Sequence, residues 1–389
     1  MAASVIPEFD THICLISNQA AANLLPVTEP RLQPKHAVLV VSPEMKDQAY
    51  WFRLALKEVL PQLSVETLEL VSAFDIGAMM DAFFGLFDRL QTAGHAPLLN
   101  VTGGTKPMAI AALRAAECAD APSFYLELER NAVTFLTKER TTIHLERGQN
   151  LKAYLLAYGL KLKKPEPSAV PFTAELKGLT ERLIRTPSYK ANYGQINWLA
   201  AEAGKSELLT ADCSGLHEGT QAILDEFERS GLLTVRGRNV RFSSEATRFF
   251  VNGGWLEAYA ANVAQSTFPD SKVISNAKIE VLPNARSSAT DKPVENELDV
   301  LFWAREHLCV IECKTSNLSG DERVENVIYK VSSIEQNFGK KVIPMLLSYK
   351  PLSDTARSRA KSCGIRVAAG DDLMRLPERL KHFVNGAAQ

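Results

Sequence analysis

Two short apolar stretches that carry charged residues constrain the fold of this chain more than any other feature. Residues 296–304 and 308–313 are mostly apolar and aromatic, and the polar segment 304–307 lies between them. This pattern predicts two strands joined by a tight hairpin. Acids and a lysine interrupt both apolar runs, where an unpaired charge is costly unless it serves a function.

The spacing of these charges predicts a metal site. Side chains alternate between the two faces of a strand, so Glu297 and Asp299 share one face, and Glu312 and Lys314 also share a face. A hard cation such as Mg²⁺ or Mn²⁺ is held by a few carboxylates together with water and phosphate oxygens. A lysine beside such carboxylates stays cationic and can stabilise an attacked phosphodiester. The bland alternative is an exposed strand pair with ordinary surface charges.

On these residues the chain resembles the PD-(D/E)xK nuclease superfamily, with Asp299 as the first acid and Glu312-Cys313-Lys314 as the ExK motif. The proline that usually precedes the first acid is missing. The segment from Gly253 to Tyr259 is similar to the family's leading helix, in which a glutamate faces the metal. The resemblance implies catalytic roles for Glu257, Glu297, Asp299, Glu312 and Lys314, and a metal held by Asp299, Glu312 and the backbone carbonyl of Cys313.

Two further residues lie near this motif in the sequence. Lys330 belongs to the helix expected after the ExK strand and by analogy lies close to the chemistry. His307 falls in the expected hairpin turn, from which it could reach substrate, but we expect it to take no part in catalysis. The seven histidines are scattered and form no HExxH pattern.

A second motif, Asn100-Val-Thr-Gly-Gly-Thr-Lys-Pro-Met108, lies between an expected strand and an expected helix. Its two glycines allow the backbone to approach a ligand, and its threonines and the free amides at the helix start can donate to an anion. The spacing is neither GxxxxGK[ST] nor GxGxxG, which argues against ATP hydrolysis and dinucleotide redox chemistry. A tight turn capped by threonine is the plain alternative.

With its surroundings this motif resembles the ligand loop of CARF domains, the CRISPR-associated Rossmann-like sensors of cyclic oligoadenylates. Expected strands alternate with expected helices, which predicts a mostly parallel sheet with ligands beyond its carboxyl edge. The expected strands are 12–16, 36–42, 64–71, 97–102 and 123–128, and the expected helices are 46–60, 76–92 and 108–119. The resemblance implies that the ligand-binding residues are Ser17, Asn18, Gln19, Asn23, Thr102, Gly103, Gly104, Thr105, Lys106 and Met108.

The middle of the chain predicts a separate small domain. Residues 151–162 are expected to be helical, and residues 163–171, with three prolines, are typical of a linker. Three expected helices, 176–184, 193–203 and 220–230, are followed by a hairpin over 231–243, an order that suggests a winged helix. The predicted domains are a CARF sensor over 1–150, a linker and winged-helix-like domain over 151–250, and a PD-(D/E)xK nuclease over 251–389.

Composition agrees with a multidomain α/β protein. The 389 residues include 46 % hydrophobic and 23 % charged residues, and the formal net charge is −1. A chain of this length can bury sizeable cores, and nucleic-acid affinity must come from local patches and metal rather than bulk charge. No membrane span or signal peptide is evident, so a cytoplasmic location is expected. The six cysteines, with no CxxC pair, are expected to be free thiols rather than zinc ligands.

The order of the motifs resembles CARF nucleases activated by cyclic tetra-adenylate in type III CRISPR defence. It implies a homodimer that binds the cyclic ligand on its two-fold axis and cuts DNA, RNA or both with Mn²⁺ or Mg²⁺. Two alternatives stay open at this point. The chain could be a ligand-responsive transcriptional regulator that binds DNA through its winged helix, or a ring nuclease that degrades cyclic oligoadenylate in the sensor itself.

Overall fold

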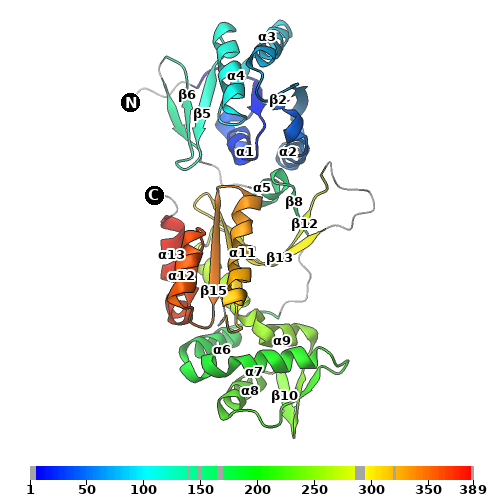
Figure 1. Ribbon diagram of the computed structural model, residues 1–389, viewed down its shortest axis with the longest axis vertical. Helices are drawn as coiled ribbons and strands as arrows, with labels where there is room; N and C mark the ends of the chain where they lie inside the picture. Colours follow the sequence, from blue (N-terminus) through cyan, green and yellow to red (C-terminus); the bar gives the residue numbers. More distant parts are fainter. Residues whose placement is uncertain are drawn as a thin grey trace.

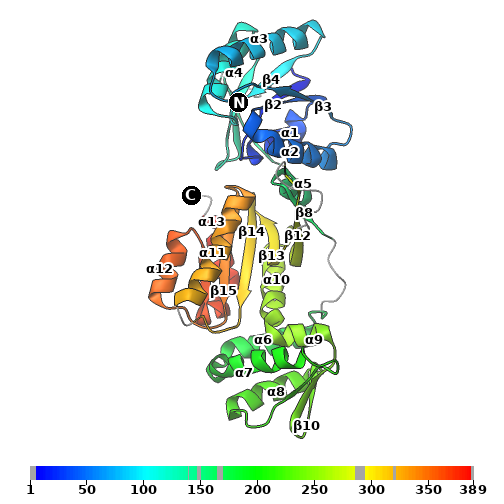
Figure 2. The same ribbon diagram turned by 45° about the vertical axis from the view of Figure 1, so that its right-hand side comes forward.

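The computed structural model describes residues 6–138, 140–146, 150–163, 170–284, 294–318 and 321–386, with the backbone only at 321–324, 335 and 336. The molecule is elongated, with three parts stacked along its long axis (Figure 1). The N-terminal α/β domain lies at one end, the C-terminal α/β domain in the middle, and the helical segment that follows residue 170 at the other end, as the turned view also shows (Figure 2). The C-terminal domain therefore lies between the other two parts.

The N-terminal domain is built on a seven-stranded sheet in the order β3-β2-β1-β4-β5-β6-β7. Strands β1 to β5 are parallel, and β6 and β7 are antiparallel additions at one edge. The five predicted strands are confirmed, and β6 and β7 are new. The strands are β1 Thr11–Leu15, β2 His36–Val41, β3 Ser64–Glu69, β4 Pro97–Asn100, β5 Ser123–Glu127, β6 Ala132–Phe135 and β7 Thr142–His144. The α-helices are α1 Ala21–Thr28, α2 Lys46–Val59, α3 Ile76–Thr92 and α4 Lys106–Cys118, with the 3₁₀ turns η1 Pro30–Leu32 and η2 Pro43–Met45.

The segment that follows residue 170, in the middle of the sequence, has the helices and the wing that the sequence predicts. Its helices are α6 Ala174–Arg185, α7 Pro187–Ala203 and α8 Glu218–Arg229. A three-stranded sheet, ordered β10-β11-β9, completes it with β9 Thr210–Asp212, β10 Leu233–Arg236 and β11 Asn239–Phe242. Residues 164–169 of the predicted linker lie outside the described residues.

The C-terminal domain contains a six-stranded mixed sheet in the order β16-β15-β14-β13-β12-β8. The predicted hairpin is present, and its turn residues Arg305 and Glu306 both have positive φ, as two-residue hairpin turns require. The strands are β12 Ile274–Val281, β13 Glu295–Ala304, β14 His307–Lys314, β15 Val342–Ser348 and β16 Arg366–Ala369. The helical segments are α9 Glu245–Phe249, η3 Phe250–Gly254, α10 Trp255–Thr267, α11 Asp321–Phe338, α12 Asp354–Ser362, η4 Gly370–Arg375 and α13 Leu376–Asn385.

The prediction of one helix over residues 151–162 is wrong. The helix α5 ends at Ala157, and Gly159, with φ of +76°, turns the chain. Residues Leu160–Leu162 then form β8, which pairs antiparallel with β12 at the edge of the C-terminal sheet. The apolar Leu160 and Leu162 satisfy a sheet edge as well as they would a helix face, which is why the sequence pattern did not separate the two.

One apolar core runs through both α/β domains. It joins side chains of the first domain, such as Cys14 and Phe52, through Tyr154 to Leu301 and Val331 of the C-terminal domain. The helices α6, α7 and α8 share a second core with the other face of the C-terminal sheet. The three parts are therefore packed on one another rather than tethered. Among the described residues, no helix combines the length and the apolar character needed to cross a lipid bilayer.

Candidate functional site

The hairpin of β13 and β14 brings the first acid of the motif beside the ExK sequence. Val300 pairs with Ile311, so the next antiparallel pair sets Asp299 opposite Glu312. The Asp299 carboxylate accepts a hydrogen bond of 2.6 Å from the backbone N–H of Cys313. This bond fixes Asp299 against the strand that carries the second acid and the lysine.

Glu312 is a buried carboxylate whose charge is balanced by two lysines. Its side chain is only 1 % exposed. The Nζ of Lys314 donates to its Oε1 at 2.6 Å, and the Nζ of Lys330, on α11, donates to its two oxygens at 2.7 and 2.9 Å. Such pairing makes a buried acid tolerable. Burial alone would lower the pKa of Lys314, but Glu312 and Asp299 outweigh it and raise the pKa, so this lysine stays cationic.

Two further carboxyl groups crowd the same place. Glu257, in the first turn of α10, has its Oε2 buried with no hydrogen-bond partner among the described residues. Burial, and then the charges of Asp299 and Glu297, raise the pKa of Glu257 to about 8. Burial, and then Glu312, raise the pKa of Asp299 to about 6. The five predicted catalytic residues therefore act on one another electrostatically and belong to one site.

This donor set fits a hard divalent cation. Burial and mutual repulsion oppose the ionisation of these carboxyl groups, and a bound positive charge would favour it. The Oε2 of Glu257, which has no hydrogen-bond partner among the described residues, could contribute a lone pair to such an ion. Within the described ranges, no three His, Cys, Asp or Glu side chains are arranged to enclose an ion. Mg²⁺ is commonly held by one or two carboxylates and completed by water and phosphate oxygens.

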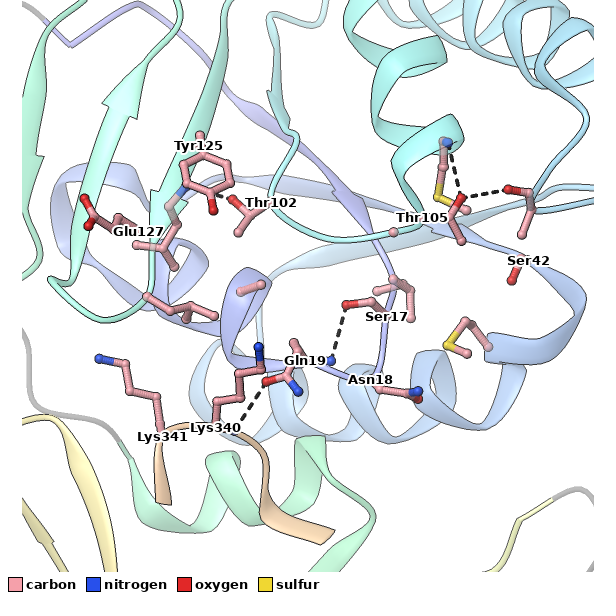
Figure 3. A pocket seen from close by; sticks show the side chains of 18 of the residues that line it. Ser17, Asn18, Gln19, Ser42, Thr102, Thr105, Tyr125, Glu127, Lys340 and Lys341 are labelled. Carbon is pink, nitrogen blue, oxygen red and sulfur yellow. Dashed lines mark hydrogen bonds between the residues drawn. The ribbon is translucent and has the colours of Figure 1, made fainter. Parts of the chain in front are cut away.

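The second predicted site is a cavity of about 1170 Å³ beyond the carboxyl ends of the parallel strands. Its volume exceeds the roughly 300–1,000 Å³ of ordinary small-molecule sites, so it has room for a larger ligand. Polar side chains from several loops face it (Figure 3). Of the residues predicted to bind a ligand, Ser17, Asn18, Gln19, Thr102, Gly104, Thr105 and Met108 line it.

The other three predicted ligand residues do not line this cavity in the part of the chain that the structure describes. Asn23 is buried and donates its amide to the carbonyl of Leu15 at 2.9 Å. Gly103 lies so close to that strand that a Cβ would be 2.1 Å from the same carbonyl oxygen. Lys106 is exposed at the start of α4. Asn23 and Gly103 thus shape the loop, while a ligand role for Lys106 stays a prediction.

Several residues of the cavity carry no motif in the sequence. Tyr125 and Glu127 reach it from β5. His307, Lys340 and Lys341 line it from the C-terminal domain. The sequence alone gives little sign that Lys340 and Lys341 belong to a binding site. Only the packing of the two domains brings them to the cavity. His307 is the first residue of β14 rather than a turn residue, and it lines the sensor cavity at the opposite end of the strand from Glu312.

A Rossmann-like domain with a large ligand cavity, packed on a mixed sheet that carries the Asp299 acid and the ExK motif, defines a ligand-sensing nuclease. Sequence comparison agrees with this class. Residues 11–154 belong to the family described as the Card1 CARF domain, and residues 243–386 belong to the family of Card1-like endonuclease domains. Together the two families cover most of the chain.

Solved structures share the whole architecture. Protein VC1899 from Vibrio cholerae is 21 % identical, with a TM-score of 0.81 over 97 % of this chain and 98 % of that one. Can2 from Sulfobacillus thermosulfidooxidans, solved in complex with cyclic tetra-adenylate, is 25 % identical, with a TM-score of 0.78 over 97 % and 99 %. A type III CRISPR defence DNA nuclease activated by cyclic oligoadenylate is 16 % identical, with a TM-score of 0.59 over 98 % of this chain and 52 % of that one. A search among curated protein sequences gave no significant match.

Proposed function

We propose that this protein is a cyclic tetra-adenylate-activated, metal-dependent nuclease of type III CRISPR antiviral defence, which acts in the cytoplasm as a homodimer and cuts DNA, RNA or both. In this proposal residues 1–150 sense the ligand, residues 151–250 link and brace the domains, and residues 251–389 carry the chemistry. The observation that supports it most is the pairing, in one packed molecule, of a large polar sensor cavity with the Asp299 and Glu312 site. The family membership of both domains agrees with it.

The chemistry follows from the residues of the candidate active site. Mg²⁺ or Mn²⁺, held by Asp299, Glu312 and the carbonyl of Cys313, would supply positive charge to the attacked phosphate and lower the pKa of a bound water. Lys314 stays cationic beside that phosphate and balances the charge that develops on it. Water adds to phosphorus, the bond to the leaving sugar oxygen breaks, and the proton of the water passes to solvent or to the leaving oxygen. Glu297 and Glu257 would stand beside the ion, whose charge would favour the ionised form of the buried Glu257 carboxyl.

The sensor cavity supports a nucleotide ligand. It offers hydroxyl and amide groups from Ser17, Asn18 and Gln19 on one side and from the Thr102–Thr105 loop on the other. Tyr125, which is 48 % exposed, presents a ring on which a base can stack. Because a homodimer has two such cavities related by a two-fold axis, a ring with the same symmetry fits best.

The test is a cleavage assay on the full chain. Plasmid DNA, single-stranded DNA and single-stranded RNA are incubated with the protein and Mn²⁺, each with cyclic tri-, tetra- or hexa-adenylate or with no ligand, and a Glu312→Gln sample reports contaminating nuclease. We expect cutting with cyclic tetra-adenylate and none without ligand. Ligand-independent cutting, or no cutting with any ring, would contradict the proposal. Loss of the ring itself during the assay would instead support the ring-nuclease alternative.

A further inference from the structure

The end of helix α11 is the place where the endonuclease domain meets the sensor. The hydroxyl of Tyr154 donates to the carbonyl oxygen of Phe338 at 2.8 Å. The next residue, Gly339, lies against Tyr158, since a Cβ at that glycine would be 2.2 Å from the tyrosine oxygen. The backbone N–H of Lys340 then donates to Oε1 of Gln19 at 3.3 Å. Consecutive residues at this helix end are therefore held by the N-terminal part of the chain.

Lys341, the next residue, is a buried cation that forms no salt bridge within the part of the chain that the structure describes. Its side chain is only 3 % exposed, and its Nζ donates to the amide oxygen of Asn131 at 2.9 Å. Burial lowers the pKa of Lys341, although Glu306 and Glu129 partly oppose this. A buried ammonium with only a neutral partner is costly, and a bound anion would relieve that cost.

Lys340 and Lys341 both line the sensor cavity, and Figure 3 shows their side chains rising into it from the endonuclease segment. The sensor's own charged lining is mainly acidic, with Glu44, Glu127 and Glu129 against the single cation Arg130. Arg130 already pairs with Glu127 at 3.3 Å. Neither lysine has an ion-pair partner among the described residues. The endonuclease domain thus supplies the cations that the sensor side lacks.

We propose that Lys340 and Lys341 of the endonuclease domain bind phosphate groups of the ligand in the CARF cavity, so that the ligand bridges the two domains. This proposal rests on the proposed function, because it takes the ligand to be a cyclic oligoadenylate. Each phosphate of such a ring carries a full negative charge, and a polyanion cannot enter a cavity lined by uncompensated acids without added cations.

The same contact offers a route to the active site. Eight residues separate Lys330 from the end of α11 at Phe338, about 12 Å of helix. A phosphate that draws Lys340 and Lys341 toward the sensor therefore acts at the end of the helix that carries Lys330, which donates to the carboxylate of Glu312. A second cavity, of about 390 Å³, lies along this route and is lined by Ser17 and Asn18 on the sensor side and by Glu297 and Lys330 on the catalytic side.

Binding measurements on the full chain test the proposal without use of cleavage. The affinity for cyclic tetra-adenylate is measured by calorimetry at several salt concentrations for the wild type, Lys340→Ala, Lys341→Met and Lys341→Arg. Lys361→Ala removes an exposed lysine of the same domain on α12, outside the cavity, and serves as the matched control. Thermal unfolding verifies that each variant is folded, and the exposed Lys340 gives a variant that does not disturb the core.

We expect Lys340→Ala and Lys341→Met to weaken binding by about tenfold or more each, as the loss of a charge-assisted hydrogen bond does. The dependence of log K on log salt should also fall by about 0.7 for each lost phosphate contact. Lys341→Arg should retain more affinity than Lys341→Met, and Lys361→Ala should bind as the wild type does. Wild-type affinity and salt dependence in both Lys340→Ala and Lys341→Met would overturn this proposal alone. A wild-type protein that binds no cyclic oligoadenylate would overturn the proposed function, and this proposal with it.

Discussion

Glu312 is a buried acid that the proposed catalytic role and the packing of the domain both depend on. Its two oxygens are held by Lys314 and Lys330, so the side chain has one fixed position. Glu312→Gln keeps the shape but removes the charge that a metal and both lysines require. We expect cleavage to fall by at least about 10³-fold, since several kcal/mol of transition-state stabilisation are lost. The measurement is the single-turnover cleavage rate at saturating ligand.

Ligand affinity provides the internal control for this variant and should be nearly unchanged, because Glu312 is not among the residues that line the sensor cavity. Glu325→Gln is a matched surface control, since Glu325 lies on α11, the helix of Lys330, but pairs with Arg359 at the surface. It should cut at the wild-type rate. Lys314→Ala and chelation by EDTA should both reproduce the loss seen with Glu312→Gln. Wild-type cutting by Glu312→Gln or Lys314→Ala would remove the active-site assignment.

His12 predicts how the sensor domain responds to acid. It is fully buried on β1 between Phe9 and Phe124, its ring nitrogens have no hydrogen-bond partner among the described residues, and burial lowers its pKa to about 3. His12 binds a proton near pH 6.5 in the unfolded chain but only near pH 3 in the folded chain. The contribution of neutral His12 to the free energy of unfolding is therefore complete above pH 6.5 and is lost as the pH falls toward 3. Between pH 7 and pH 5 the loss is about 2 kcal/mol.

A His12→Leu variant isolates this effect. Between pH 7 and pH 5 its free energy of unfolding should decrease by about 2 kcal/mol less than that of the wild type, as measured by urea unfolding at the two pH values. His144→Leu, at an exposed position of β7, is the control and should follow the wild type. An equal acid sensitivity in His12→Leu and the wild type would mean that His12 is protonated in the folded protein.

The site residues that could be predicted from the sequence are those that lie close to one another along the chain. Asp299 and Lys314 could be placed on neighbouring strands because strand periodicity and a short turn fix their faces. Lys341 could not be found in this way. Its significance depends on Asn131 and a cavity wall more than 200 positions earlier in the chain, and no local pattern encodes that contact.

At the scale of elements, the junction of α11 with the sensor depends on the close approach of Gly339 and Tyr158. Gly339 has φ of +82°, and an added methyl group would collide with the tyrosine hydroxyl. Gly339→Ala should therefore destabilise the protein by more than the roughly 1–3 kcal/mol that a left-handed residue alone costs. Chemical denaturation of the purified variant measures the difference.

Two companion variants separate the contact from the backbone strain. Gly94→Ala has a similar φ of +80° with open space around it, so it should show the strain alone. Tyr158→Ala removes both the oxygen and the ring carbons that the methyl group would meet. In that background Gly339→Ala should cost less, and the cycle gives the coupling between the two positions. Additive effects would show that this packing does not contribute to the junction.

Elements with strong periodicity could be predicted from the sequence, and short edge strands could not. The helix α3 has the predicted bounds because its apolar positions recur with helical period and Asp75 caps its first turn. Strands β6, β7 and β8 have only three or four residues each. Their hydrogen-bond partners, not their own sequences, make them strands.

At the scale of the whole molecule, the proposed dimer makes a prediction about stoichiometry. If one cyclic ligand occupies a site on a two-fold axis, two chains should bind one ring. Light scattering should give the mass of a dimer, and calorimetry should give one cyclic tetra-adenylate per two chains. One ring bound per chain would mean that each cavity works alone and that the symmetry argument for ring size fails.

The strand β8 and the helix α5 have a consequence for the exchange of parts between such proteins. Both belong by sequence to the stretch that follows the sensor sheet, yet β8 forms the edge of the nuclease sheet and Tyr154 sits in the core common to both domains. A chimera that fused a foreign sensor at residue 243 would keep the catalytic motif but lose an edge strand and bare the apolar surface beneath it. Such a hybrid would aggregate, whereas one cut before residue 151 would retain the whole nuclease fold. A sensor can therefore be exchanged only at a point before residue 151, so that α5 and β8 stay with the nuclease sheet.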